Sequence, residues 1–230
     1  MTSRIVKFHN FNDQYRHNKI DLRKHTLIEF ARKIADKLGY EVISYIDFGT
    51  FGSAFKITKF SVLKLTTDIR EVYTAKMLLN KEPEHIVNYH NVKKIESEFL
   101  QNDVYALIMD YVFSIKDGES KNKNFFDCFT YNFDDQEDFF KNNIFNQKHI
   151  NTFINEYKEK YKNGLSDEQI NKNIQELMEL AMEAKQLNIY PLDVHSGNLG
   201  YKFVDTNLVY FDVGVNKNYK IVPIDILLID

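Results

Sequence analysis

Three residues in the last quarter of the chain have the types and spacing needed to hold a metal ion beside a reacting hydroxyl group. Asp193 and Asn198 lie five positions apart in the segment DVHSGN, and Asp212 follows in FDVG, fourteen positions after Asn198. A carboxylate can orient or accept a hydroxyl proton, an amide oxygen can ligate Mg²⁺, and a second carboxylate can bridge the metal to a phosphate group. A pair of β-turns is the simpler interpretation, because Asp, Asn and Gly are favoured in turns.

A glycine-containing turn earlier in the chain has the composition of a phosphate-binding flap. The segment DFGTFGSAFK places Gly49 and Gly52 three positions apart, with Thr50 and Phe51 between them. Glycine lets backbone N–H groups come close to an anion, because it has no Cβ atom. An ordinary hairpin turn would use the same residues. The spacing differs from G-x-x-x-x-G-K-S/T, so it does not indicate a P-loop.

Lys64 lies in the apolar segment SVLKLT, which follows that turn. A lysine within a strand must either extend its ammonium group to solvent or find an anionic partner. An exposed lysine on an edge strand is the simpler interpretation. Glu71, seven positions later, is the preferred partner, and a phosphate group could share the lysine with it.

An amphipathic helix is predicted over residues 26–38, before these segments. Its apolar residues recur at helical spacing, and Thr26 and Glu29 have the spacing of a capping box. Gly39 is placed to end the helix. The fold therefore opens with one helix that has an apolar side to bury.

Strands and a second helix are predicted between this helix and the middle of the chain. Residues 41–65 read as three short strands, and two further strands follow near 86–95 and 104–112. A helix is predicted from Asp68 to about Asn80, between the first three strands and the fourth. Its predicted apolar side contains Ile69, Val72, Tyr73 and Leu79.

The second half of the chain has one clear helix and one unclear region. Residues 114–165 mix polar and aromatic residues without a clean period, but their many Phe and Tyr residues favour packed helices over a disordered linker. Ser166 and Gln169 then form a capping box for a long helix that ends near Asn188. This helix leads directly to the segment that contains Asp193.

Composition narrows the class of protein. The chain has 230 residues, 43% of them hydrophobic, which is enough for a sizeable core. A net charge of −3 without a basic block argues against nucleic acid as a partner. The single cysteine, Cys128, cannot form an internal disulfide, which fits a reducing compartment. We therefore expect a cytoplasmic protein, in a bacterial or host cell, with neither a signal segment nor a membrane span.

The four motifs occur in the order found in the protein-kinase-like superfamily, and the chain resembles that superfamily over about residues 44–112 and 166–216. IDFGTFGSAFK resembles the Gly-rich loop, with Asp47 in place of its first glycine. VLKL resembles the strand whose lysine binds ATP phosphates, which implies that Glu71 pairs with Lys64. The nucleotide-binding residues implied here are Gly49, Thr50, Phe51, Gly52, Ala54, Lys64 and Glu71.

The remaining motifs resemble the hinge, the catalytic loop and the metal-binding motif of the superfamily. IMDYV resembles the hinge, with Met109 as gatekeeper and the backbone of Asp110 and Val112 meeting adenine. DVHSGN resembles the catalytic loop, and FDVG resembles the Asp-Phe-Gly motif with Val213 in place of Phe. The resemblance implies Asp193 and Lys64 as catalytic residues, and Asn198 and Asp212 as ligands of Mg²⁺.

The expected fold is α+β: a two-lobed, protein-kinase-like fold. An antiparallel sheet with a helix forms the N-terminal lobe, and a reduced, mainly helical lobe follows. Only 16 residues follow Gly214, so the helices that dock peptide substrates are missing. The expected ranges are 1–112 for the N-terminal lobe, including the extra helix at about 26–38, and 113–230 for the C-terminal lobe, with an insert at 114–165, the catalytic loop at 191–200 and the metal-binding motif at 211–214.

The function implied by this resemblance is transfer of the γ-phosphate of ATP to a hydroxyl group, with a protein Ser/Thr as the first choice of acceptor. The pattern D-x-H-x-G-N, with His195 in place of the usual lysine, is closer to aminoglycoside and choline kinases, so a small-molecule acceptor is the alternative. A pseudokinase that serves as a binding module, and an enzyme that transfers a nucleotidyl group, also remain open.

Overall fold

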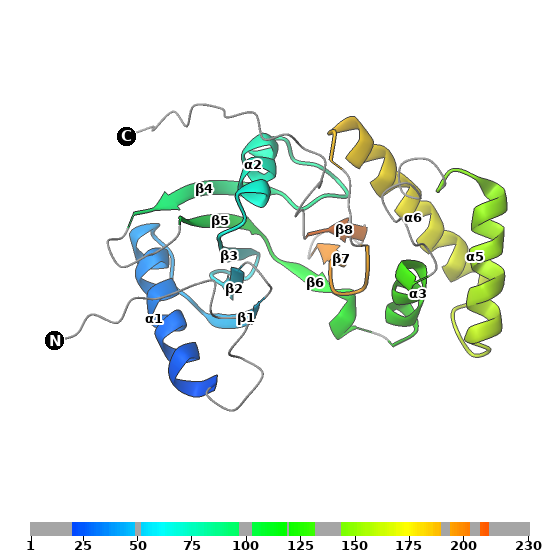
Figure 1. Ribbon diagram of the computed structural model, residues 1–230, viewed down its shortest axis with the longest axis horizontal. Helices are drawn as coiled ribbons and strands as arrows, with labels where there is room; N and C mark the ends of the chain where they lie inside the picture. Colours follow the sequence, from blue (N-terminus) through cyan, green and yellow to red (C-terminus); the bar gives the residue numbers. More distant parts are fainter. Residues whose placement is uncertain are drawn as a thin grey trace.

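The computed structural model describes residues 20–48, 52–96, 103–118, 120–131, 144–189, 194–202 and 208–211. These residues form an α+β structure with an antiparallel sheet and α1 at one end of its long axis, and α3, α5 and α6 at the other (Figure 1). The predicted α+β class is confirmed, with an antiparallel sheet in the first lobe and mainly helices in the second. The likeness to protein kinases remains a prediction. The ranges predicted for the two lobes remain predictions.

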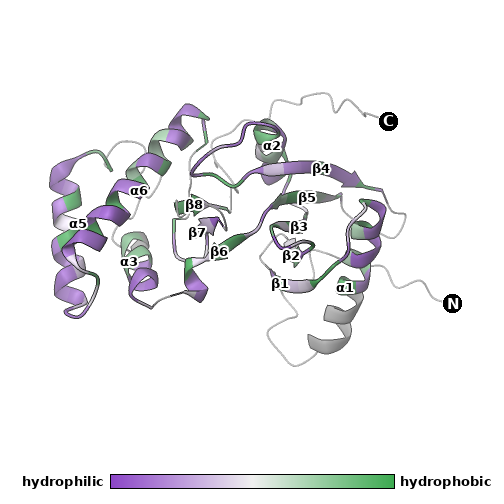
Figure 2. Cartoon of the chain, turned by 180° about the vertical axis from the view of Figure 1, so that it is seen from behind, coloured by the Kyte–Doolittle hydropathy of each residue, from purple (hydrophilic) through white to green (hydrophobic). Residues whose placement is uncertain are grey.

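A five-stranded antiparallel sheet makes up most of the first lobe. Its strand order is β1-β2-β3-β5-β4, so the two edge strands are β1 and β4. Figure 2 shows β4 as mostly hydrophilic and its neighbour β5 as mostly hydrophobic, in keeping with an edge strand beside an internal one. The strands are β1 (Ser44–Phe48), β2 (Gly52–Lys56), β3 (Ser61–Thr66), β4 (Tyr89–Ile95) and β5 (Val104–Asp110).

Helix α1 (Ile20–Lys37) packs on one face of this sheet. The prediction that it begins near residue 26 is wrong, because the helix starts six residues earlier and Thr26 lies inside it. Gly39 does follow its end, with a φ of 80° that glycine adopts without strain. The core beneath α1 includes Leu27, Ala31, Ile34, Ala35, Phe55, Leu63, Leu65 and Ile108.

Helix α2 (Ile69–Leu78) follows β3, and Asp68 caps its N-terminus by accepting a hydrogen bond from the N–H of Arg70. The apolar side predicted for this helix is partly wrong. Ile69 and Tyr73 are both 42% exposed, whereas the buried residues of α2 are Glu71, Val72, Ala75 and Leu78. A charged residue therefore occupies the side of α2 that faces the protein.

The second lobe contains helices and a small three-stranded sheet. Strands β6 (Val112–Ser114), β7 (Leu199–Lys202) and β8 (Leu208–Tyr210) pair antiparallel in the order β6-β7-β8. The capping box that Ser166 and Gln169 form at the start of α6 is as predicted. The other elements are the 3-10 helix η1 (Ile115–Asp117), α3 (Ser120–Tyr131), α5 (Gln147–Lys160) and α6 (Asp167–Gln186).

One hydrophobic core joins the two lobes. It runs from Val72 and Leu78 of α2, through Leu107 of β5, to Leu177 of α6. In the predicted insert, α3 and α5 contribute edge-to-face aromatic pairs such as Phe125 with Phe153, so its described part is packed as expected. Across the part of the chain that the structure describes, none of the helices combines the length and the apolar character that a membrane span requires.

Candidate functional site

The ion pair between Lys64 and Glu71 joins β3 to α2. The Lys64 Nζ atom lies 2.6 Å from the Glu71 Oε1 atom. The Glu71 side chain is only 3% exposed, whereas that of Lys64 is 20% exposed. The pairing predicted from the sequence is therefore present, and the simpler interpretation of Lys64 as an exposed edge lysine is wrong, because β3 lies inside the sheet between β2 and β5.

This arrangement leaves the lysine able to serve a second anion. An ammonium group has three N–H donors, so one carboxylate does not exhaust its hydrogen-bonding capacity. Burial of Glu71 requires a nearby positive charge, which holds the Lys64 side chain in place. Binding of a phosphate group by Lys64 while it stays paired with Glu71 remains a prediction.

Asp68 supports the pair by fixing the start of α2, the helix that carries Glu71. Its carboxylate accepts hydrogen bonds from the N–H, Nε and Nη2 groups of Arg70, each at 3.0 Å. Burial raises the pKa of the Asp68 carboxyl, but the hydrogen bonds and charge of Arg70 outweigh it, so the pKa lies below its usual value. Asp68 is therefore charged at neutral pH and suited to the helix N-terminus.

Two of the predicted flap residues, Gly52 and Ala54, lie on β2 beside the lysine. Ala54 is directly opposite Lys64, and Gly52 is opposite Thr66. A Cβ atom on Gly52 would collide with the carbonyl oxygen of Leu65. Glycine is therefore required here for β2 and β3 to approach each other, independently of any phosphate. The other predicted flap residues, Gly49, Thr50 and Phe51, lie outside the described residues.

The predicted hinge is the end of β5 and the start of β6. Met109 is buried at 5% exposure and lies opposite Val62 of β3. The N–H of Asp110 donates to the carbonyl oxygen of Asn88 at 3.0 Å, so this donor is already used within the fold. Val112 lies on β6, opposite Lys202 of β7. Contact of this segment with adenine remains a prediction.

The described part of the predicted catalytic loop, residues 194–198, is held by hydrogen bonds within itself and to Phe211, which directly follows β8. The N–H of Gly197 donates to Nδ1 of His195 at 2.9 Å, and the N–H of Asn198 donates to the His195 carbonyl oxygen at 2.9 Å. The N–H of Phe211 donates to the carbonyl oxygen of Asn198 at 3.1 Å. His195 thus shapes the loop through both its ring and its backbone.

Ser196 anchors the same loop to the region of the insert. Its N–H donates to the Asp127 carboxylate of α3 at 3.1 Å. Its carbonyl oxygen accepts hydrogen bonds from the N–H of Lys116 at 3.0 Å and from the hydroxyl of Ser114 at 3.2 Å. Sequence reasoning missed Asp127. The available signal was a lone carboxylate between buried aromatic residues in FFDCF.

Asn198 is the predicted metal ligand that the structure describes. It is 8% exposed, and its backbone is bonded to Phe211, the residue immediately before Asp212. Amide and carboxylate oxygens are hard ligands that suit Mg²⁺. The described donor fits that metal. Asp193 and Asp212 themselves lie outside the described residues.

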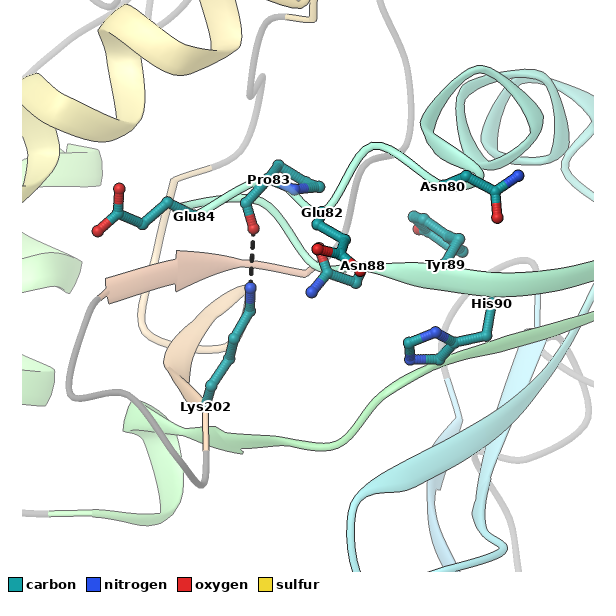
Figure 3. A pocket seen from close by; sticks show the side chains of 8 residues that line it. All are labelled: Asn80, Glu82, Pro83, Glu84, Asn88, Tyr89, His90 and Lys202. Atoms are coloured by element: carbon teal, nitrogen blue, oxygen red, sulfur yellow. Dashed lines mark hydrogen bonds between the residues drawn. The ribbon is translucent and has the colours of Figure 1, made fainter.

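A pocket of about 500 Å³ lies elsewhere, between the segment after α2, the start of β4 and the end of β7 (Figure 3). Of the predicted site residues that the structure describes, none lines it. Lys202 reaches across one side and donates to the Pro83 carbonyl oxygen at 2.9 Å. Its lining residues are Asn80, Glu82, Pro83, Glu84, Asn88, Tyr89, His90 and Lys202.

No protein-family model matches the chain, and no curated protein matches it. Among solved structures, the chain is similar to APH(2″)-IIa in its ternary complex with streptomycin and ATP, at 13% sequence identity and a TM-score of 0.30. The similarity covers 80% of this chain and 69% of that chain. The roles of individual residues therefore rest on the geometry of this protein.

Proposed function

We propose that this protein is an ATP-dependent phosphotransferase that moves the γ-phosphate of ATP to a hydroxyl group. The observation that supports it most is the ion pair between buried Glu71 on helix α2 and partly exposed Lys64 on β3, an internal strand of the antiparallel sheet. A second support is the loop that contains Asn198, whose backbone is bonded to the residue before Asp212. An ion pair that served only to stabilise the fold would not require a possible metal ligand, Asn198, in a hydrogen-bonded loop of the second lobe.

The proposed chemistry assigns one role to each residue. Lys64, held by Glu71, binds the α- and β-phosphates, and Asn198 and Asp212 hold Mg²⁺. Mg²⁺, when bound, would neutralise charge on the phosphate oxygens. Asp193 orients the acceptor hydroxyl and receives its proton as the oxygen bonds to the γ-phosphorus and ADP leaves. Most of the rate enhancement then comes from positioning and from charge stabilisation.

We propose a protein Ser/Thr as the acceptor, with a small molecule as the second candidate. The observation that favours the second is the role of His195 in the D-x-H-x-G-N segment, where its ring accepts the Gly197 N–H. That pattern is the one that resembles aminoglycoside and choline kinases. The two acceptors differ in where labelled phosphate would accumulate.

The test is incubation of purified wild type and Asp193→Ala with Mg²⁺ and γ-labelled ATP, alone, with a cell lysate, and with a panel of hydroxyl-bearing metabolites. We expect wild type to transfer label and Asp193→Ala to lose at least 99% of that rate while still binding ATP. Asp36→Ala, which changes an exposed carboxylate at the end of α1, is the matched control and should keep the wild-type rate.

Each outcome of this test identifies a class of protein or of acceptor. Label on a protein band supports the protein acceptor, and label in the metabolite fraction supports the small-molecule acceptor. ATP binding without any transfer would point to a pseudokinase, and a gain of AMP mass would point to nucleotidyl transfer. Full transfer by Asp193→Ala would refute the proposed role of Asp193.

A further inference from the structure

Helix α6 directs a glutamate toward the chain segment that follows α2. Glu183 accepts two backbone hydrogen bonds there, from the N–H of Glu84 at 2.7 Å and from the N–H of His85 at 2.6 Å, one on each carboxylate oxygen. Hydrogen bonds to a carboxylate are roughly twice as strong as those between neutral groups. One side chain of the second lobe thus binds two adjacent peptide groups about a hundred residues earlier in the chain.

A second glutamate, two turns earlier on the same helix, binds strand β8. Glu176 accepts a hydrogen bond from the N–H of Leu208 at 2.9 Å, and its side chain is only 12% exposed. Residues seven apart lie on the same side of a helix, so Glu176 and Glu183 face the same way. Helix α6 therefore holds both the segment after α2 and the strand β8.

The two segments that α6 holds are also bonded to each other. The N–H of Tyr210 donates to the His85 carbonyl oxygen at 2.9 Å, and the N–H of Val87 donates to the Tyr210 carbonyl oxygen at 3.0 Å. Nδ1 of the buried His85 lies 3.0 Å from the Leu208 carbonyl oxygen. Helix α6, the segment 84–87 and strand β8 form a closed, three-way set of hydrogen bonds, which we call the α6 clamp.

Each member of the α6 clamp precedes or follows, in the sequence, one part of the proposed site. The segment 84–87 follows α2, which carries Glu71, and strand β8 is two residues from Asp212. Helix α6 ends seven residues before Asp193. The α6 clamp therefore connects the segment after α2, the helix of Glu71, with β8, and Phe211 directly after β8 is hydrogen-bonded to Asn198.

We propose that Glu183 and Glu176 are positioning residues, which hold the segment after α2, the helix of Glu71, in register with β8 and, through Phe211, with the loop of Asn198. Neither glutamate belongs to the proposed machinery that contacts ATP, so both act through the backbone that they bind. The effect on catalysis rests on the proposed function, whereas the mechanical coupling does not. The two parts can therefore be tested separately.

The coupling is tested by amide hydrogen exchange, followed by NMR, in wild type, Glu183→Gln, Glu176→Met and Glu168→Gln. Glutamine has one acceptor oxygen, and its NH₂ group would face a backbone N–H, so Glu183→Gln should lose one of the two bonds. A glutamine at position 176 could keep the single bond to the Leu208 N–H through its amide oxygen, so methionine is used there to remove the acceptor. Glu168→Gln is the control, because Glu168 is an exposed glutamate in the first turn of α6.

We expect Glu183→Gln to speed exchange at least tenfold at Glu84 and His85 and also at Leu208 and Tyr210, with Glu168→Gln within twofold of wild type. Glu176→Met should give the reciprocal result, starting from Leu208. Faster exchange confined to the segment that each glutamate touches would overturn the coupling. If Glu183→Gln fails to fold, Glu176→Met, which removes a single bond to the backbone, still decides the matter.

The catalytic consequence is tested by steady-state kinetics of the same variants. Misplacing a catalytic group by about 1 Å can lower a rate about a hundredfold, and we expect kcat to fall at least tenfold in Glu183→Gln. KM for ATP should stay within twofold, because Lys64 and Glu71 are unchanged. Coupled exchange with an unaltered kcat would overturn the positioning role. Absence of turnover in wild type would instead refute the proposed function and leave the exchange result standing.

Discussion

At the scale of single residues, the asymmetry of the Lys64–Glu71 pair decides what each substitution does. Glu71 is almost fully buried, whereas Lys64 is in partial contact with solvent. Replacing Lys64 leaves the buried Glu71 carboxylate without the charge of the Lys64 ammonium group. Neutralising Glu71 instead leaves an ammonium group that solvent can still reach. The two halves of this ion pair should therefore differ in their effect on stability.

We expect Lys64→Met to lower the free energy of unfolding by about 3 kcal/mol, and Glu71→Gln by about 1 kcal/mol. Both should weaken ATP binding if the proposed function holds. Urea denaturation measures the first effect and isothermal titration the second. The double variant Lys64→Met/Glu71→Leu is the control. It also removes the buried Glu71 carboxylate, so it should be more stable than Lys64→Met alone. Equal losses in the two single variants would contradict the asymmetry.

At the scale of elements, α2 depends on the cap at its N-terminus. Asp68→Ala should destabilise the protein by about 1 to 2 kcal/mol, because the cap and the bonds to Arg70 are lost. Asp68→Asn should lose less, since asparagine also caps helices. Urea denaturation at neutral pH measures both variants.

The lowered pKa of Asp68 sets a direction for the dependence of stability on pH. Its contribution is present above about pH 3.9, the ordinary value for aspartate, and is lost as the pH falls through the lower value of the folded state. Between pH 7 and pH 3 the free energy of unfolding should therefore fall less in Asp68→Asn than in wild type. An identical acid loss in both proteins would show that this carboxyl is not responsible.

The close approach of strands β6 and β7 at Gly200 leads to a second prediction at the scale of elements. A Cβ atom on Gly200 would collide with the Phe113 carbonyl oxygen and the Val112 side chain. Gly200→Ala should separate the strands and lower the thermal midpoint, with a loss of about 1 to 3 kcal/mol. Gly118→Ala is the control, because its nearest atom would lie at an ordinary 3.4 Å. Similar midpoints for the two variants would rule out the proposed crowding.

At the scale of the whole molecule, the core that both lobes share should make unfolding cooperative. Leu177 of α6 is fully buried in that core, whereas Met182 on the same helix is 47% exposed. Leu177→Ala should cost about 2 to 5 kcal/mol and Met182→Ala less than about 0.5 kcal/mol. Far- and near-ultraviolet circular dichroism should follow one urea transition in each variant. Two separated transitions would show that the lobes unfold independently.

Sequence patterns predicted the elements that local physics controls. The capping box of α6 works within four residues, and of the apolar α6 positions at helical spacing Ile170, Ile174, Leu177, Ala181 and Ala184 are buried, whereas Met178 and Leu187 are only partly buried. The strands near Lys64 were also predicted, and Glu71 was the preferred partner of Lys64 from the residues and from the resemblance. The start of α1 was missed, because the apparent capping box at Thr26 and Glu29 lies within a longer helix.

The helical and strand segments and the candidate residues could be predicted from the sequence, because periodicity and capping depend on neighbours along the chain. Packing between distant elements, by contrast, places Glu71 rather than Tyr73 on the buried side of α2, pairs Asp127 with Ser196, and selects the peptide groups that the glutamates of α6 bind. These contacts join residues tens to about a hundred positions apart. Their partners are selected by how the helices and sheets pack, which no local pattern encodes.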